Sequence, residues 1–132
     1  MKRRRIGNTT IHVSEIGFGC GGNAGLMVGS DLAEQERVIG YALDRGIDYF
    51  DTSPDYGSGV AEDNLGRALK ALRRDAFITS KVEIRATNLS DIAGHIERSV
   101  EMSLRRLRVD ALDIVQIHNG PAGRPPELSG QS

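Results

Sequence analysis

Apolar residues recur along this chain in two alternating patterns, one typical of amphipathic helices and one typical of buried strands. Where apolar residues stand three or four positions apart, the pattern predicts helices at about 31–45, 61–73 and 90–107. Short apolar runs between them predict buried strands at 16–19, 47–52, 76–82 and 112–118. Asp31 is expected to cap the first helix, with Glu34 at the capping-box position and Gly46 just after the helix end.

Both ends of the chain depart from this alternation. Residues 3–13 hold two extended segments around the turn formers Gly7 to Thr10, which predicts a β-hairpin. The basic residues 2–5 suit a nucleic-acid-binding tail or a charged first strand, and the hairpin pattern favours the strand. No apolar run follows them, which argues against a secretory signal. Residues 119–132 hold three prolines and three glycines without periodicity, which predicts an irregular C-terminal tail.

Strands that alternate with helices predict an α/β fold with a parallel sheet, because parallel strands need a long crossover between them. A doubly wound sheet and a (β/α)8 barrel both fit this order of elements. The spacing Gly17-x-Gly19-x-x-Gly22 matches a dinucleotide-binding turn, which would favour the doubly wound sheet. In such a turn the helix begins inside the glycine loop, next to the pyrophosphate. The predicted helix begins at about residue 31, which argues against this alternative.

The composition is typical of a folded protein that stays in a reducing compartment. With 132 residues, 39% of them hydrophobic, the chain has room for one domain with a core and is not disordered. Its 17 basic and 18 acidic residues nearly cancel, so neither nucleic acid nor a membrane is an expected partner. The single cysteine, Cys20, cannot form an internal disulfide, which favours the cytoplasm. Three scattered histidines, at positions 12, 95 and 118, predict no metal site.

Polar side chains stand where the predicted strands end, and this is where α/β proteins place their active sites. Asp51 ends the second buried strand, with Tyr56 five residues later. Lys81 ends the third buried strand and His118 ends the fourth. Each residue taken alone has an ordinary structural interpretation, such as a turn former or a loop aromatic. Together, an acid, a phenol, an amine and an imidazole at one edge of the sheet predict a functional site.

The four side chains suit proton transfer to a carbonyl oxygen. A tyrosine titrates at about 10 in water, so it needs a nearby cation to exchange a proton at neutral pH. Lys81 can supply that charge, Asp51 can keep a partly buried Lys81 charged, and His118 can orient the carbonyl by a hydrogen bond. Hydrolysis is not favoured, because no serine lies in a nucleophile elbow and no cysteine–histidine pair is evident.

Five stretches of the sequence, in order, resemble the N-terminal half of the aldo-keto reductase family, whose members are NADP(H)-dependent (β/α)8 barrels. The stretches are 14–19, 46–57, 61–69, 78–82 and 113–119. The most specific is Asp51-Thr-Ser-Pro-Asp-Tyr-Gly, with the Glu and Leu-Gly that follow it at 62 and 65–66. The resemblance implies that Asp51, Tyr56, Lys81 and His118 form the catalytic tetrad, with Tyr56 as the general acid/base.

The resemblance also implies a cofactor and a substrate class. NADP(H) is the expected cofactor, with NAD(H) as the alternative. Gly19, Cys20, Gly21 and Asp51 are the residues expected beside its nicotinamide. The substrate would be a small aldehyde, ketone or sugar. Within this class, the Gly-Ser-Gly spacing after Tyr56 resembles the branch of the family that acts on aldoses and related sugars.

Chain length sets the last expectation. The site residues recur at intervals of roughly 30 to 37 positions, so eight strand–helix units would need about 240–300 residues. Residues 1–118 are therefore expected to form half of a barrel, followed by the tail at 119–132, and to lack most of the family's phosphate-binding residues. Two functions stay open. One is an oxidoreductase present as a truncated chain, whose intact form interconverts a carbonyl and an alcohol. The other, which is favoured for the isolated 132 residues, is an inactive half-barrel that acts only by self-association or complementation.

Overall fold

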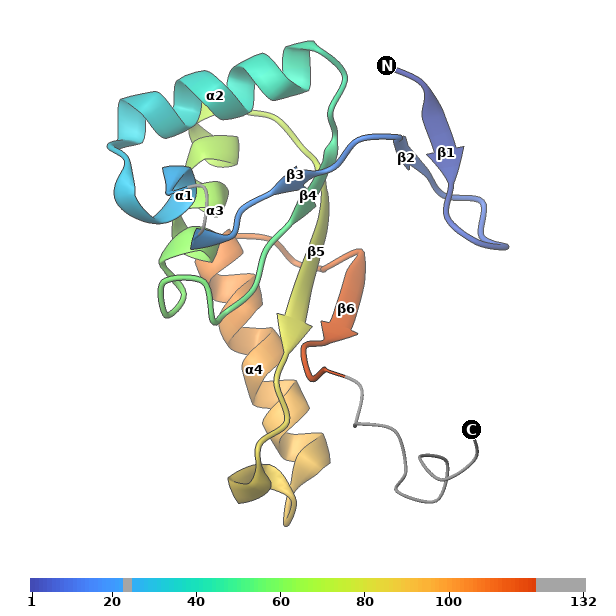
Figure 1. Ribbon diagram of the computed structural model, residues 1–132, viewed down its shortest axis with the longest axis vertical. Helices are drawn as coiled ribbons and strands as arrows, with labels where there is room; N and C mark the ends of the chain where they lie inside the picture. Colours follow the sequence, from blue (N-terminus) through green and yellow to red (C-terminus); the bar gives the residue numbers. More distant parts are fainter. Residues whose placement is uncertain (23–24, 121–132) are drawn as a thin grey trace, which may run out of the picture.

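The computed structural model describes residues 1–22 and 25–120, which form a small hairpin and a parallel sheet covered by helices (Figure 1). The elements in chain order are β1 (Arg3–Arg5), β2 (His12–Ser14), β3 (Phe18–Gly19), α1 (Leu26–Gly29), α2 (Leu32–Asp44), β4 (Tyr49–Asp51), α3 (Val60–Leu72), β5 (Phe77–Val82), the 3₁₀ helix η2 (Ala86–Asn88), α4 (Ile92–Leu107) and β6 (Ile114–Ile117). Every predicted helix and strand is present, with bounds shifted by one or two residues. Most of the predicted tail, residues 121–132, lies outside the described residues.

Local details correct the sequence-based expectations in two places. The short helices α1 and η2 were not predicted, because elements of four and three residues are too short to show a helical period. Asp31 caps α2 as expected, accepting a hydrogen bond from the backbone N of Glu34 at 2.8 Å. The Glu34 side chain instead pairs with Arg37, at 2.8 and 2.9 Å, so the expected second half of the capping box is wrong.

The order of the strands decides between the two folds that the sequence left open. β3, β4, β5 and β6 pair in sequence order, and every pair is parallel. A doubly wound sheet reverses its strand order at a switch point and carries helices on both faces. Here α2, α3 and α4 lie on one side of the sheet (Figure 1), as helices do around a barrel. The chain therefore forms part of the wall of an α/β barrel, and the doubly wound alternative is wrong.

The alternation of side chains along each strand separates an apolar face from a polar one. Phe50 of β4 and Ile78 of β5 pack against the helices. Their partners from the helices are the buried residues Ile39, Leu43, Leu65, Leu69 and Leu107. Asp51 is one position from Phe50, and Lys81 is three positions from Ile78. Because side chains alternate along a strand, Asp51 and Lys81 project to the opposite face. The core thus fills the helix side, while the charged residues lie on the face that a barrel encloses.

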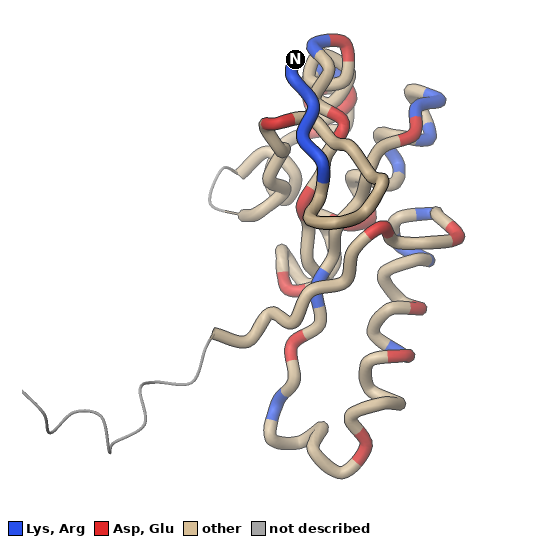
Figure 2. The backbone as a smooth tube through the Cα atoms, turned by 90° about the vertical axis from the view of Figure 1, so that its right-hand side faces the viewer, with Lys and Arg blue, Asp and Glu red and all other residues tan. Residues whose placement is uncertain are grey.

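The N-terminal hairpin lies at the end of the sheet where the strands begin (Figure 1). Its strands β1 and β2 pair antiparallel, as predicted. Asp48, just before β4, accepts a hydrogen bond from the backbone N of Ser14 at 2.8 Å and pairs with Arg3. Arg4 pairs with Glu15 at 3.3 Å, so the basic start is a charged strand (Figure 2). In residues 1–22 and 25–120, no helix has both the length and the apolar character needed to cross a membrane.

Candidate functional site

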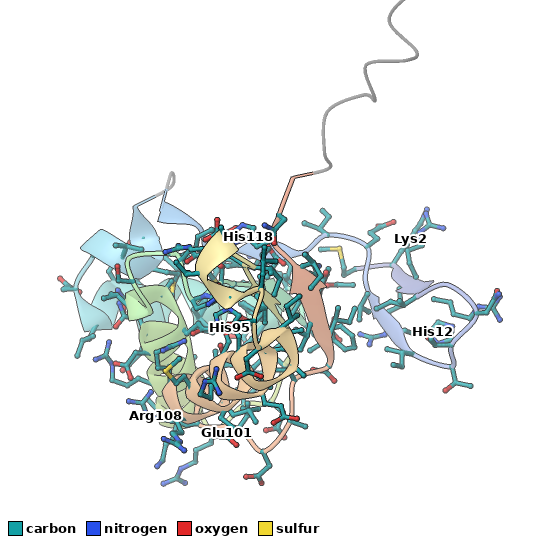
Figure 3. All side chains as sticks on the ribbon, turned by 90° about the horizontal axis from the view of Figure 1, so that it is seen from below. Lys2, His12, His95, Glu101, Arg108 and His118 are labelled. Atoms are coloured by element: carbon teal, nitrogen blue, oxygen red, sulfur yellow. The ribbon has the colours of Figure 1, made fainter. Side chains whose placement is uncertain are left out.

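Four polar side chains meet at the edge of the sheet where its parallel strands end. Asp51 is the last residue of β4, Lys81 is the last but one of β5, and His118 directly follows β6. Tyr56 belongs to the loop between β4 and α3. The structure brings all four together as the sequence predicts, because neighbouring parallel strands end on the same side of a sheet. Figure 3 shows His118 just beyond the end of β6.

An ion pair between Lys81 and Asp51 lies at the centre of this cluster. Lys81 Nζ donates to Asp51 Oδ2 at 2.6 Å and to the carbonyl oxygen of Thr52 at 2.8 Å. The Lys81 side chain is 9% exposed, whereas that of Asp51 is 33% exposed. A charge that has lost its water needs a counterion and hydrogen-bond partners. Asp51 and Thr52 therefore allow Lys81 to remain charged in this buried position.

The ring of Tyr56 lies against both Lys81 and His118. Lys81 Nζ is 5.1 Å from the centre of the tyrosine ring, and the imidazole meets that ring edge-on with centroids 5.9 Å apart. The loop that follows turns sharply, with positive φ at all three of residues 57–59. A Cβ at Gly57 would lie 2.8 Å from a valine side chain, so glycine is required there for two reasons. This tight loop is what fixes Tyr56 against the charged pair.

Two residues of the same loop hold the imidazole of His118. Its Nδ1 lies 3.1 Å from Ser53 Oγ and 3.1 Å from Asp55 Oδ2. The backbone N of His118 also donates to the carbonyl oxygen of Val82 at 2.8 Å, which continues the pairing of β6 with β5. The ring is therefore anchored on its Nδ1 side and through its backbone.

Sequence reasoning missed Ser53 and Asp55 as site residues. Both stand in a run of typical turn formers, so their polarity already had a local explanation. The available signal was the presence of two further polar side chains between Asp51 and Tyr56. Asp55 borders an open depression of about 720 Å³ beside the cluster, which is lined by Pro54, Asp55, Ser58, Glu83, Arg85 and His118.

The loop after β3 borders the cluster on its other side. Gly19 pairs in register with Asp51, and the backbone N of Cys20 donates to the Asp51 carbonyl oxygen at 2.8 Å. A Cβ placed on Gly19 would meet no atom within 4 Å, and one on Gly21 would lie 3.7 Å from the ring of Tyr56. The end of β3 therefore leaves room beside Asp51 and Tyr56 for a flat ring to approach.

The thiol of Cys20 does not face this space. The residue is 0% exposed and belongs to the apolar core between sheet and helices. Burial raises the pKa of the Cys20 thiol to about 12; the Asp51 carboxylate adds to the rise and Lys81 partly offsets it. The thiol therefore stays protonated and is neither a nucleophile nor a ligand at neutral pH. Any role of Cys20 beside a cofactor is left to its backbone.

Known proteins resemble this chain in sequence. A model of the aldo/keto reductase family matches residues 15–127. L-galactose dehydrogenase of Arabidopsis thaliana is 36% identical over 121 residues, which cover 88% of this chain and 37% of that protein. The aldo-keto reductase yakc of Schizosaccharomyces pombe, whose name specifies NADP(+), is 32% identical over 132 residues, covering 94% and 38% of the two chains.

Solved structures resemble it in fold. An aldo-keto reductase of Bacillus halodurans in its holo form matches with a TM-score of 0.74 and 34% identity, over 96% of this chain and 43% of that one. An aldo-keto reductase of Klebsiella pneumoniae in complex with NADPH matches with a TM-score of 0.66 and 30% identity, over 84% and 37%. The chain spans about 40% of the length of the curated relatives it matches.

Proposed function

Because the chain belongs to the aldo/keto reductase family of oxidoreductases, we propose that its four clustered side chains interconvert a carbonyl group and an alcohol. The observation that carries the proposal is the contact of Tyr56 with the buried Lys81–Asp51 pair. In this proposal Tyr56 is the general acid/base. It gives its proton to the carbonyl oxygen during reduction and takes a proton from the alcohol during oxidation.

Lys81 and Asp51 make this proton transfer feasible at neutral pH. When Tyr56 gives up its proton, a negative charge develops on the phenolate oxygen. The ammonium of Lys81, with Nζ 5.1 Å from the ring centre, stabilises that charge. Asp51 holds the ammonium in place and charged. His118, beside Tyr56, hydrogen-bonds the substrate oxygen and orients it toward the tyrosine.

The cofactor of the proposed reaction is NADP(H), with NAD(H) as the alternative, and when bound its nicotinamide supplies or accepts the hydride. The open space beside Gly19 and Gly21 suits a flat ring. Gly19, Gly21, the backbone of Cys20 and Asp51 would hold that ring next to Tyr56. The Klebsiella pneumoniae relative in complex with NADPH supports this choice of cofactor.

The proposed substrate is a small aldehyde, ketone or sugar. An open, polar depression borders His118, where hydroxyl groups could find partners in Asp55, Glu83 and Arg85. The name of the L-galactose dehydrogenase relative supports a sugar within this class. Screening NADPH oxidation with aldoses, simple aldehydes and ketones separates these options.

Tyr56→Phe tests the acid/base role. The test uses a chimera in which residues 1–118 are joined to the C-terminal part of the Bacillus halodurans relative, and it follows NADPH oxidation in the presence of a carbonyl substrate. Removing the hydroxyl should lower kcat by about 100-fold or more, because proton transfer by a positioned side chain contributes about 10²–10⁴-fold. NADPH affinity, measured by fluorescence, should stay unchanged.

Tyr41→Phe is the matched control, since Tyr41 is exposed on α2 and is 58% accessible. It should leave turnover intact. Undiminished turnover in Tyr56→Phe would remove Tyr56 from the mechanism.

A second candidate function rests on the outer face of β6. Val115 and Ile117 are 43% and 59% exposed there, so apolar surface is open to a partner. In this alternative the chain is catalytically inactive and acts through self-association or complementation. NADPH titration of the purified 132-residue chain decides between the two. Micromolar binding with carbonyl-dependent oxidation excludes the alternative, whereas the absence of both binding and turnover supports it.

A further inference from the structure

The imidazole of His118 is held by a carboxylate whose geometry determines which ring nitrogen carries the proton. We propose that Asp55 is a positioning residue that keeps the proton of neutral His118 on Nδ1. Asp55 touches no reacting atom in the proposed mechanism and acts through the histidine. The consequence for catalysis rests on the proposed function, whereas the state of the ring can be tested without it.

The hydrogen-bonding capacity of the partners supports this assignment. An ionised carboxylate can only accept hydrogen bonds, so the Nδ1 that lies 3.1 Å from Asp55 Oδ2 must be the donor. Ser53 Oγ, also 3.1 Å from Nδ1, already accepts a hydrogen bond from the backbone N of Asp55 at 3.2 Å. The opposite tautomer would point the Nδ1 lone pair at the carboxylate. Which nitrogen carries the proton is set by such contacts.

Neighbouring residues hold Asp55 in place. The Nη2 of Arg85 lies 3.7 Å from Oδ1 of Asp55, the oxygen that is not paired with His118, and also pairs with Glu83 at 2.6 Å. The backbone of Asp55 is tied to Ser53, which is fully buried. The titratable and charged groups around the imidazole are Asp55, Tyr56, Glu83, Arg85 and the ion pair of Asp51 with Lys81.

This arrangement assigns two states of His118 to the two directions of the reaction. With its proton on Nδ1, the neutral ring presents a lone pair at Nε2 and cannot donate to a carbonyl oxygen. Donation from Nε2 needs a second proton on the ring. Carbonyl reduction therefore draws on the charged ring, and alcohol oxidation draws on the neutral ring as an acceptor. The transferred proton still moves through Tyr56, so His118 ends each turnover as it began.

Nitrogen-15 NMR of the full 132-residue chain with labelled histidine tests the assignment directly. His12 lies on the hairpin and His95 on α4 (Figure 3), and His118→Gln identifies the remaining signals. With the ring neutral, the wild-type chain should show a protonated Nδ1 and an unprotonated Nε2. Asp55→Ala should move the population toward a protonated Nε2. Asp110→Ala removes an exposed carboxylate elsewhere and should leave His118 unchanged.

Two more variants separate Asp55 from its neighbour. Asp55→Glu keeps a carboxylate and should restore most of the Nδ1-protonated form, which a merely structural role would not predict. Ser53→Ala should leave the tautomer in place, because the carboxylate still accepts from Nδ1. A protonated Nε2 in the wild-type chain, or an Asp55→Ala spectrum identical to wild type, would overturn the proposal.

Failure of the proposed function would look different. In that case the tautomer would follow Asp55 as described, while the chimera would show no carbonyl-dependent oxidation of NADPH. If the chimera is active, Asp55→Ala should make the rate of reduction less dependent on pH, with NADPH affinity unchanged, because a neutral ring protonated at Nε2 can donate to the carbonyl oxygen. An active Asp55→Ala chimera with the wild-type pH profile would contradict the catalytic consequence alone.

Discussion

Single residues of the site are held by partners that their burial makes necessary. Lys81 is 9% exposed, and its ammonium is bonded to both Asp51 and Thr52. His118 has the carboxylate of Asp55 and the hydroxyl of Ser53 at the same distance from Nδ1. These contacts orient the charged and hydrogen-bonding atoms before any substrate arrives, which lowers the cost of reorganising them during a reaction.

Cys20 allows a prediction at this scale. Its thiol is fully buried and its pKa is raised to about 12, so almost no thiolate is present near pH 8. A thiol-specific reagent should therefore leave the folded chain unmodified over hours and react completely once denaturant is added. With a reagent that releases a chromophore on reaction, absorbance measures the labelling rate of both the folded and the denatured chain. Rapid labelling of the folded chain would show that Cys20 is accessible.

At the scale of elements, short polar links add to the packing that holds neighbouring pieces together. The hairpin is attached to the sheet through Asp48, which bonds the backbone N of Ser14 and pairs with Arg3. The helices α3 and α4 are joined through Glu62, whose 0% exposed side chain accepts from Ser80 at 2.6 Å and from Arg106 at 2.6 Å. Each link leads to a test of how an element is held.

The hairpin should loosen in acid. Burial tends to raise the pKa of Asp48, but the hydrogen bonds from Ser14 and the pairing with Arg3 outweigh it and lower the value. A carboxyl with a lowered folded pKa stabilises the fold above its unfolded value, about 4, and that contribution is lost as pH falls through the folded pKa. The protection of the Ser14 amide, measured as its exchange rate relative to that of an unfolded peptide at the same pH, should therefore fall in that range. Asp48→Asn should show weaker protection already at neutral pH and little further loss in acid.

The buried link between α3 and α4 should carry much more stability than a surface pair nearby. Arg106→Ala leaves the Glu62 carboxylate buried without its counterion and should cost about 3 kcal/mol. Arg105→Ala removes an exposed pair with Glu101 on the same helix and should cost less than about 0.5 kcal/mol. Urea unfolding measures both. Equal losses in the two variants would contradict the role assigned to the buried pair.

At the scale of the whole molecule, the described residues form an open sheet. β3 and β6 are its two edges, each with one side of its backbone unpaired within the described part of the chain. Side chains on the outer face of β6, Val115 and Ile117, are exposed although their partners on β5 are covered by helices. An apolar edge strand is a surface that promotes pairing with another chain.

The 132-residue chain should therefore associate as its concentration rises. Sedimentation velocity should show a shift to larger species, and Ile117→Lys should reduce that shift because a charge on an edge strand opposes pairing. Glu101→Lys on the exposed face of α4 serves as a control for the added charge. A purely monomeric wild-type chain at high concentration would contradict this expectation.

Much of the fold was predictable because its signals are local. The apolar periods of α2, α3 and α4 and the short runs of β4 to β6 depend on neighbouring residues, and the structure confirms them within two positions. The placement of Asp51, Lys81 and His118 together followed from their positions at strand ends. The contact of His118 with Ser53 and Asp55 joins residues 65 and 63 positions apart, and no local pattern announces it.

The amino-acid sequence by itself determined which elements form, which of their ends carry polar side chains, and the family to which the motifs point. Only the tertiary structure decided the strand order β3-β4-β5-β6, which excludes the doubly wound sheet. It also decided that the thiol of Cys20 lies in the core and that a carboxylate holds His118. Periodicity arises from residues adjacent in the chain, whereas strand order, burial and the state of a ring nitrogen arise from distant residues brought together by folding.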